Sequence, residues 1–324
     1  MLQPVGAYCA FVAILSLPSC AYAQDGSDSY PSKPVRIIVG TAPGGTDVQA
    51  RMYANRLSEV LGRQFLVENH PGKNVAWGMV SRAPADGHTL LVVLPDLTFA
   101  PALSKDLRVD PIKDFVPISL MSRASYLLVV NPVLPAKSVR ELVGLARAQP
   151  GKLTFGGGLG GSGTHLMSMW FHHQAGIKAA YVPYRGTAQT VIDLLGGQID
   201  AMFSAGVTTI PHIKTGKLRG LAISAAQRSK ELPDMPTIIE QGIREFEAGT
   251  FHGWAAPAGT SPAIINKLSA ELAKIAKLPE ITEKLRADNA VAVGSTPDQF
   301  AQLIAGEIQR WRKLVAELRI TVNE

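Results

Sequence analysis

The chain carries its most distinctive chemistry in a glycine tract, six glycines within the eight positions from Gly156 to Gly163. The tract follows a strand-like run, Leu153 to Phe155, and precedes a helical pattern that begins at Thr164. Glycine lacks a Cβ, so backbone N–H groups can line a small concavity and a ligand can approach the main chain closely. Because a helix N-terminus adds unpaired N–H donors and the positive end of the helix dipole, the tract predicts a site for a carboxylate or a phosphate.

A second loop, Ala42 to Asp47, repeats this design with two adjacent glycines. It leaves the first strand-like run of the mature chain, Val35 to Val39, and enters a helix. Ligands of open α/β sheets bind beyond the carboxyl ends of strands, and small-molecule sites favour domain interfaces. We therefore expect the two loops to face each other and to hold one anion between two helix N-termini. The alternative is that both loops are only tight connections from strand to helix.

Nucleotide binding is a competing interpretation, since the tract also has the spacing Gly156-x-Gly158-x-x-Gly161. A dinucleotide site requires an acidic residue about 20 positions later for the ribose, but residues 166–192 contain no Asp or Glu. No lysine follows at Walker spacing, and Ser162 lacks the second glycine of a nucleophile elbow because Thr164 stands there. A nucleotide-binding enzyme stays an alternative, which these absences disfavour.

Three histidines, His165, His172 and His173, do not have the arrangement of a metal site. Adjacent side chains on a helix diverge by roughly 100°, and no carboxylate stands at a useful offset within that helix. His165 either donates to a ligand carboxylate or is only a polar residue at the helix start. His173 shares a helical stripe with apolar residues and is expected in the core or at its boundary. We expect no metal and no cofactor.

The N-terminus has the pattern of a secretory signal peptide. An apolar run, Tyr8 to Leu17, ends before the small-x-small pattern Ala21-Tyr22-Ala23, although no Lys or Arg precedes the run. We expect residues 1–23 to be removed and the mature protein to be exported and soluble. The run is too short to span a membrane, and no later segment approaches 18 consecutive apolar residues.

Both cysteines, Cys9 and Cys20, precede this expected cleavage site. The mature chain would therefore have no disulfide, thiolate nucleophile or cysteine-ligated zinc. A lipid anchor on Cys20 is an alternative, but Pro18 is an awkward residue shortly before it. The formal net charge of +6 suits an anionic ligand. The basic residues are scattered without interleaved aromatic residues, so we expect no nucleic acid partner.

Short strand-like runs alternate with helical patterns along the mature chain, which predicts parallel α/β sheets. Helix starts are indicated at Thr46-x-x-Gln49, Ser138-x-x-Glu141, Ser261-Pro262 and Thr296-Pro297-Asp298-Gln299. No low-complexity linker divides the chain, so a split into two domains must use crossing segments near Val130 and Gly249–Trp254. The strand-like runs are Val35–Val39, Phe65–Glu68, Thr89–Val93, Tyr126–Val130, Leu153–Phe155, Ala201–Phe203 and Leu218–Ile223.

A set of ordered motifs resembles the Bug family of extracytoplasmic solute receptors, the substrate-binding subunits of tripartite tricarboxylate transporters. The resemblance runs from Tyr30 nearly to the C-terminus. Its segments are Tyr30–Pro34, Ala42–Gly45, Val67–Gly72, Asp86–Leu91, Asp110–Phe115, Asn131-Pro132, Leu134–Ser138, Val182–Gly186, Asp193–Gln198, Gly216–Arg219 and Ala256–Thr260.

The resemblance implies an α/β periplasmic-binding-protein architecture of type II, the Venus flytrap, with the ligand cleft between two domains. Domain 1 would combine residues 30–129 and 252–324, and domain 2 would be residues 130–251. Such a receptor binds a small carboxylate and presents it to membrane subunits of a transporter, without catalysis. We expect a monomer because the receptor must hinge. A sensory module that passes the ligand to a signalling partner stays an alternative.

The resemblance also implies which residues meet the ligand. One loop supplies Pro43, Gly44, Gly45, Thr46 and Asp47, and the other supplies Gly160, Gly161, Ser162, Gly163, Thr164 and His165. Their main-chain amides and ordered water would hold the carboxylate. The far end of the ligand would meet Thr98, Tyr184, Arg185, Ser204 and Phe251.

Two of these residues have structural alternatives. Asp47 either binds a ligand amine or only stabilises the first turn of a helix, where a carboxylate is favourable. Arg185 either pairs with a distal carboxylate of the ligand or ties a loop to the surface.

Three departures from the family pattern leave the ligand open. Only Thr46 separates Gly45 from Asp47, where relatives commonly have two residues. Lys73-Asn74-Val75-Ala76-Trp77 replaces a glycine-rich stretch, and Ser204-Ala205-Gly206 stands where many relatives carry an Asp-Asn pair.

Overall fold

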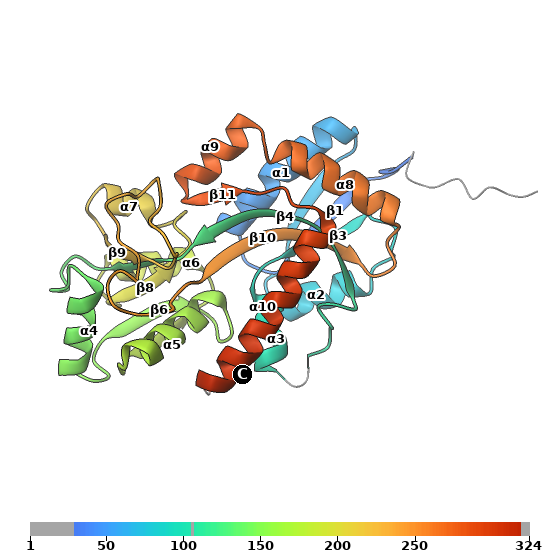
Figure 1. Cartoon of the computed structure of the whole chain (residues 1–324). Coiled ribbons are helices and arrows are strands. Elements are labelled where there is room, and N and C mark those ends of the chain that lie inside the picture. The colour runs from blue at the N-terminus through green and yellow to red at the C-terminus, as the bar shows by residue number, and fades with distance from the viewer. Residues whose placement is uncertain (1–28, 105–106, 319–324) are drawn as a thin grey trace, which may run out of the picture.

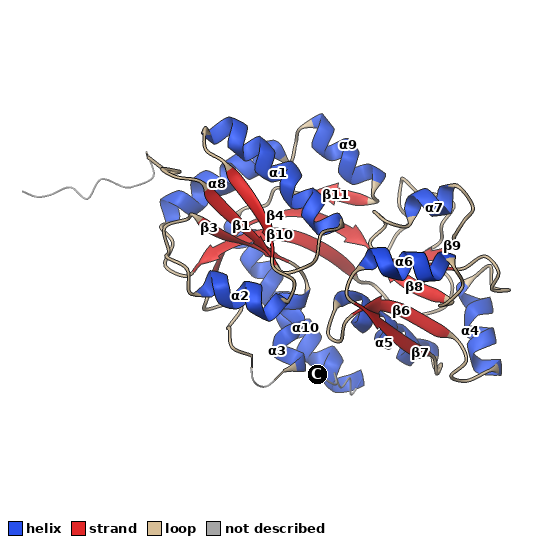
Figure 2. Ribbon diagram, turned by 180° about the vertical axis from the view of Figure 1, so that it is seen from behind, coloured by secondary structure: helices blue, strands red, loops and turns tan. Residues whose placement is uncertain are grey.

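The computed structural model describes residues 29–104 and 107–318. The expected signal peptide, residues 1–23, and both cysteines lie outside this part of the chain. The described residues form two lobes, each built on one β-sheet with helices packed against it (Figures 1 and 2). Within the described residues, no helix is both long and apolar enough to span a bilayer.

The larger sheet has six strands in the order β11-β4-β10-β3-β1-β2. One end of this sheet is parallel, since β1 pairs in parallel with both β2 and β3. The remaining pairings, β10 with β3 and β4 and β11 with β4, are antiparallel. The strand bounds are β1 Val35–Val39, β2 Phe65–Asn69, β3 Thr89–Val93, β4 Phe115–Ser125, β10 Gly249–Pro257 and β11 Ala290–Ala292.

The smaller sheet has five strands in the order β7-β6-β8-β5-β9. Here β6 is parallel to β7 and β8, while β5 is antiparallel to β8 and β9. The strand bounds are β5 Leu127–Val130, β6 Thr154–Gly158, β7 Ala180–Tyr184, β8 Ala201–Ser204 and β9 Arg219–Ile223.

The predicted parallel pairing is present in both sheets, but each sheet also has antiparallel strands and is therefore mixed. The antiparallel strands β4 and β10 lie where the chain passes between the sheets. β4 runs into β5 through Tyr126, and residues 224–248 lead from β9 to β10 without a helix. Neither passage is a helical crossover, which parallel neighbours require. The alternation of strands and helices therefore gives no signal for them.

The division into two domains stays a prediction, but sheet membership differs from its boundaries by three residues at each crossing. Residues 127–129, assigned to domain 1, belong to β5 of the smaller sheet. Residues 249–251, assigned to domain 2, belong to β10 of the larger sheet.

Each sheet has an apolar core on both faces. In the larger sheet, alternate residues of β1 point to opposite sides, so Ile37 packs with α1, α8 and α9 while Ile38 packs with α2, α3 and α10. In the smaller sheet, α4 and α5 cover one face and α6 and α7 the other. The helix bounds are α1 Gly45–Leu61, α2 Lys73–Ser81, α3 Asp96–Leu103, α4 Val139–Ala148, α5 Gly163–Ala175, α6 Thr187–Leu195, α7 Ile210–Lys214, α8 Pro262–Ile275, α9 Pro279–Ala287 and α10 Pro297–Leu318.

Helix α10 crosses from one lobe to the other (Figure 1). Its first half packs on the larger sheet through Phe300, whereas Trp311 joins a core of the smaller sheet. The Trp311 ring lies 4.4 Å from Phe99 of α3 and 6.1 Å from Trp170 of α5, between ring centroids. This packing ties the two lobes together outside the crossing strands.

One predicted capping box is present and another is absent. The box of Thr296 and Gln299 is confirmed: the Thr296 side chain accepts from the N–H of Gln299 at 3.2 Å, and the Gln299 side chain accepts from the N–H of Thr296 at 3.0 Å. The capping box predicted at Thr46 and Gln49 was wrong, because α1 already begins at Gly45 and has no side-chain cap. Gln49 instead accepts a hydrogen bond from Ser122 of β4 at 2.8 Å.

Candidate ligand-binding site

The loops that follow the parallel strands bring the candidate residues together. In the larger sheet β2, β1 and β3 are parallel neighbours, so the segments after Val39, Asn69 and Val93 emerge at one edge. In the smaller sheet the same holds for the segments after β7, β6 and β8. Two contacts join these edges. Lys73 donates from Nζ to the carbonyl of Gly161 at 3.1 Å, and a Cβ built on Gly45 would touch Val207 at 3.5 Å.

The first loop offers main-chain donors. Gly44 caps α1, and the N–H groups of Gly45, Thr46 and Asp47 have no backbone acceptor among the described residues. The Oγ1 of Thr41, at the start of the loop, is buried and has no hydrogen-bond partner in the described segments. These three N–H groups are the donors that this loop can offer to a ligand.

The Asp47 side chain is engaged in a structural contact. Its carboxylate accepts two hydrogen bonds from Arg51, both 3.0 Å long, and is only 11% exposed. This ion pair spans one helical turn at the start of α1, which agrees with the structural alternative for this residue.

The second loop is organised around the start of α5. Ser162 caps the helix by accepting from the N–H of His165, and Thr164 Oγ1 accepts from the N–H of Gly158 at 2.8 Å. The N–H groups of Gly160, Gly163 and Thr164 have no hydrogen-bond acceptor in the described part of the chain. They are the donors that this loop can offer to an anion.

The first half of the glycine tract has a different role, because Gly156 to Gly158 belong to β6. A Cβ on Gly156 would lie closer than 3.0 Å to Ile199, and one on Gly157 equally close to the hydroxyl of Tyr181. These glycines are therefore required by side chains that pack over the strand. The expectation that the whole tract is exposed to a ligand was wrong, and only residues 160–165 remain candidates.

The residues predicted for the far end of the ligand make different contacts in the structure. The buried hydroxyl of Thr98 donates to the carbonyl of Pro95 at 2.6 Å, and that of Ser204 accepts from Thr209 at 3.0 Å. Tyr184 donates to Asp193 at 2.7 Å, while Arg185 is exposed and has no partner among the described residues. Tyr184 and Ser204 are the last residues of β7 and β8, and Arg185 follows β7, so all three lie at the same edge as the glycine tract.

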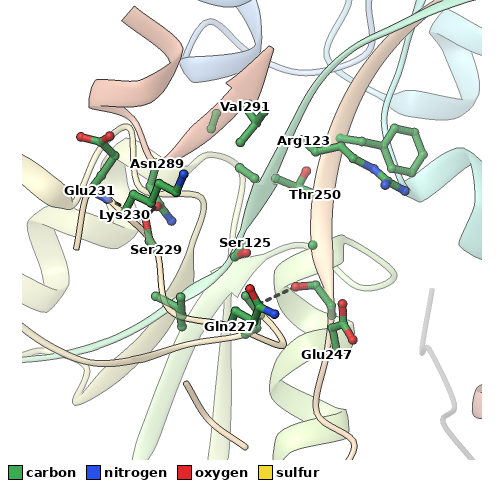
Figure 3. Close-up of a pocket in the computed structure, with 18 of the residues that line it drawn as sticks. Arg123, Ser125, Gln227, Ser229, Lys230, Glu231, Glu247, Thr250, Asn289 and Val291 are labelled. Carbon is green, nitrogen blue, oxygen red and sulfur yellow. Dashed lines mark hydrogen bonds between the residues drawn. The ribbon is translucent and has the colours of Figure 1, made fainter. Parts of the chain in front are cut away.

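Phe251 lies apart from them. It is buried in β10 and its ring packs against Phe300 at 6.0 Å between centroids. It also lines a separate cavity of about 710 Å³ beside the crossing strands (Figure 3). No other predicted ligand residue lines this cavity, whose walls include Arg123, Ser125, Ser229, Glu247, Thr250 and Asn289. The large cavity therefore does not coincide with the two donor loops, which follow β1 and β6.

Two charged residues at the site were not predicted, Lys73 and Asp96. Lys73 is the first residue of α2 and Asp96 the first of α3, so both follow strands of the larger sheet. Burial raises the pKa of Asp96, although Lys73 opposes the shift. Burial and the Lys73 charge lower the pKa of His165. Their positions directly after β2 and β3 were the signal in the sequence that could have found them.

No group of three or more His, Cys, Asp or Glu residues suited to a metal ion occurs within the described residues. His172 packs edge-on against Phe155 at 4.6 Å, and burial lowers its pKa to about 4.

Two mixed α/β sheets joined by crossing strands, with helix N-termini facing each other at the sheet edges, define the architecture of periplasmic binding proteins. Solved structures share it over nearly the whole chain. They include Rpa4515 of R. palustris with adipate, which is 31% identical, covers 90% of this chain and 99% of its own, and has a TM-score of 0.86. MatC of Rhodopseudomonas palustris with bound malate is 29% identical, covers 88% of this chain and 100% of its own, and has a TM-score of 0.83.

Sequence comparison identifies the family. Residues 49–320 match the family described as the tripartite tricarboxylate transporter family receptor, and the chain belongs to this family. BugT of Bordetella pertussis is 34% identical over 313 residues, 95% of this chain and 96% of BugT. The resemblance to the Bug receptors is thereby confirmed, as is the type of fold it implied.

Proposed function

We propose that this protein is a periplasmic receptor that captures a small carboxylate between residues 43–47 and 160–165 and delivers it to the membrane subunits of a tripartite tricarboxylate transporter. The observation that carries the proposal is the pair of helix N-termini, at Gly45 and Gly163, whose N–H groups have no backbone partner. The contact between Lys73 and Gly161 brings these two ends of the site together.

The chemistry of the donors supports a carboxylate rather than a particular acid. Main-chain N–H groups and a helix dipole recognise the anionic oxygens and not the rest of the molecule. The related proteins with adipate and with malate bind carboxylates that differ in length and in substituents. A shared clamp with a variable far end accounts for this range.

Capture requires the lobes to close over the ligand. In this proposal the two domains move about Tyr126 and residues 224–248, and the ligand binds more tightly to the closed arrangement than to the open one. A monomer exported with a cleavable signal peptide and lacking catalytic activity fits this cycle.

The main-chain donor of Gly45 can be tested by proline substitution. Gly45 is the first residue of α1 and follows an extended residue, Gly44, a setting that proline accepts. Gly45→Pro deletes the N–H and keeps the helix, while Gly45→Ala keeps the N–H and adds a similar contact to Val207. Isothermal titration with a carboxylate panel should show affinity reduced about tenfold or more in Gly45→Pro. Gly45→Ala should be nearly unchanged.

Small-angle scattering should show compaction of the wild-type protein with the bound acid. Absence of binding and of compaction across succinate, malate, adipate and aromatic acids would refute the receptor. Equal affinity of the proline and alanine variants would refute the donor at Gly45. Ligand uptake that is unchanged by deletion of the gene would favour a sensory role over transport.

A further inference from the structure

The charged residues at the edge of the larger sheet lie where a bound carboxylate would need neighbours. Lys73, Thr41 and Asp96 follow β2, β1 and β3, three parallel strands that are adjacent in the sheet. Their segments therefore emerge side by side, opposite the loop from Gly160 to His165. Among the described residues, no hydrogen bond within the larger lobe involves Nζ of Lys73, which instead reaches the carbonyl of Gly161 in the smaller lobe.

Lys73 is a cation without an anionic partner at close range. Its ammonium group has three donors, of which one meets the carbonyl of Gly161 at 3.1 Å. The same group lies 6.0 Å from the ring centroid of Trp77, and no ion pair involves it among the described residues. A carboxylate held by the N–H groups of Gly163 and Thr164 would lie next to this charge.

Asp96 has the opposite need, an acceptor oxygen without a donor. Its Oδ1 is buried and has no hydrogen-bond partner in the described residues, and no side-chain bond from Asp96 caps α3. A buried carboxyl oxygen without a donor is costly, so such an atom calls for a partner that arrives with the ligand. The burial that raises its pKa and the opposing charge of Lys73 agree with this placement.

Tyr126 places Asp96 near the donor loop. The Asp96 charge acts on Tyr126, and a Cβ built on Gly163 would lie closer than 3.0 Å to the Tyr126 hydroxyl. Tyr126 therefore lies against the first turn of α5 and within range of the Asp96 charge. The partner of Oδ1 would then sit close to the carboxylate that this turn holds.

From these contacts we infer that Lys73 and Asp96 select acids with a hydrogen-bond donor on the carbon beside the carboxylate, namely 2-hydroxy or 2-amino acids. Lys73 binds the carboxylate, and Asp96 accepts from the hydroxyl or ammonium group. The inference rests on the proposed carboxylate receptor and adds the side chains that discriminate among acids.

Matched acids that differ only at this carbon provide the test. Titration calorimetry would compare succinate with malate and aspartate, and phenylacetate with mandelate and phenylglycine. In the wild-type protein the substituted acids of at least one series should bind about tenfold tighter than the unsubstituted acid. Asp96→Ala should remove this preference and leave the affinity for the unsubstituted acid nearly unchanged. Lys73→Met should weaken all binding acids about tenfold.

Two controls address charge and folding. Asp234→Ala and Lys178→Met change exposed residues and should leave every affinity as in the wild type. Asp96→Asn keeps the shape of the side chain and would replace the alanine variant if that variant fails to fold. The asparagine variant should lose the preference for the ammonium group more than that for the hydroxyl group, because its oxygen still accepts but carries no charge.

The outcomes separate this inference from the receptor itself. Equal binding of substituted and unsubstituted acids, or a preference that survives in Asp96→Ala, overturns the inference and leaves the receptor standing. Unchanged affinities in Lys73→Met overturn the role of Lys73. If no acid of any series binds the wild-type protein, the proposed receptor function fails and the inference fails with it.

Discussion

The substitution Gly163→Ala tests how the donor loop is fitted against the crossing segment. Gly163 is the first residue of α5, and a Cβ there would lie closer than 3.0 Å to the hydroxyl of Tyr126. Its further neighbours, Tyr126 Cζ at 3.4 Å and Phe99 Cε2 at 3.6 Å, would be in ordinary contact. Tyr126 is buried between the two sheets, where burial raises its pKa to about 12, so its ring has little room to move.

The expected magnitude follows from two opposing terms. Overpacking at a buried contact costs about 1–3 kcal/mol, whereas alanine in place of glycine gains at most about 1 kcal/mol in helix propensity. We expect Gly163→Ala to lower the free energy of unfolding by about 1–2 kcal/mol. Tyr126→Phe removes the obstructing hydroxyl together with its hydrogen bond to the side chain of Thr250, and this loss by itself costs about 1 kcal/mol. The double variant should therefore be more stable than the sum of the single effects by about 1 kcal/mol or more.

Urea unfolding monitored by tryptophan fluorescence and circular dichroism would measure these differences. Gly144→Ala in α4 is the matched control, because nothing lies within 4 Å of a Cβ built there, and it should stabilise the protein slightly. A Gly163→Ala variant as stable as Gly144→Ala, or single effects that add without coupling, would refute the assigned contact.

Two further predictions concern stability. Trp311→Ala should lower it by about 3–5 kcal/mol, because the indole fills the space between Phe99 and Trp170, and Trp311→Phe should cost less; a thermal unfolding series would measure both. Burial lowers the pKa of His172 and His252 to about 4, below the unfolded value of about 6.5, so the unfolded state binds protons first as the pH falls. Stability should decrease from about pH 6.5 towards pH 4, and replacement of both histidines by phenylalanine should flatten this dependence in urea titrations.

The central strands could be predicted from the sequence because their environment is simple. Ile37, Ile38, Leu90 and Leu91 lie in parallel strands covered on both faces, and such strands are nearly continuous apolar runs. The crossing strands lack this signal. In β4, Ser119 is fully buried and donates to the carbonyl of Ser295 at 2.8 Å, a contact between residues far apart in the chain. No local pattern in the sequence predicts a hydrogen-bond partner so distant in the chain.

The candidate site likewise has features that the sequence predicts and features that it does not. Both donor loops were visible in the sequence because glycine and a helix start are local features. The packing of Gly157 under Tyr181 was not visible, nor was the contact of Lys73 with Gly161, since each depends on how separate segments are placed. For Lys73 the sequence showed only a departure from the family's glycine-rich stretch, and no local pattern marked Asp96.

The nature of the donors limits how ligand choice can vary in a receptor of this kind. A main-chain N–H group is present in every residue except proline, so exchanges among the other residue types at 45–46 or 163–164 leave it in place. Specificity must then reside in side chains beside the clamp, at the segments that follow β2 and β3. Asp96 occupies one of these segments, so substitutions there should change which acid binds. Lys73 occupies the other and adds its charge to the anion clamp, so its loss should weaken all acids alike.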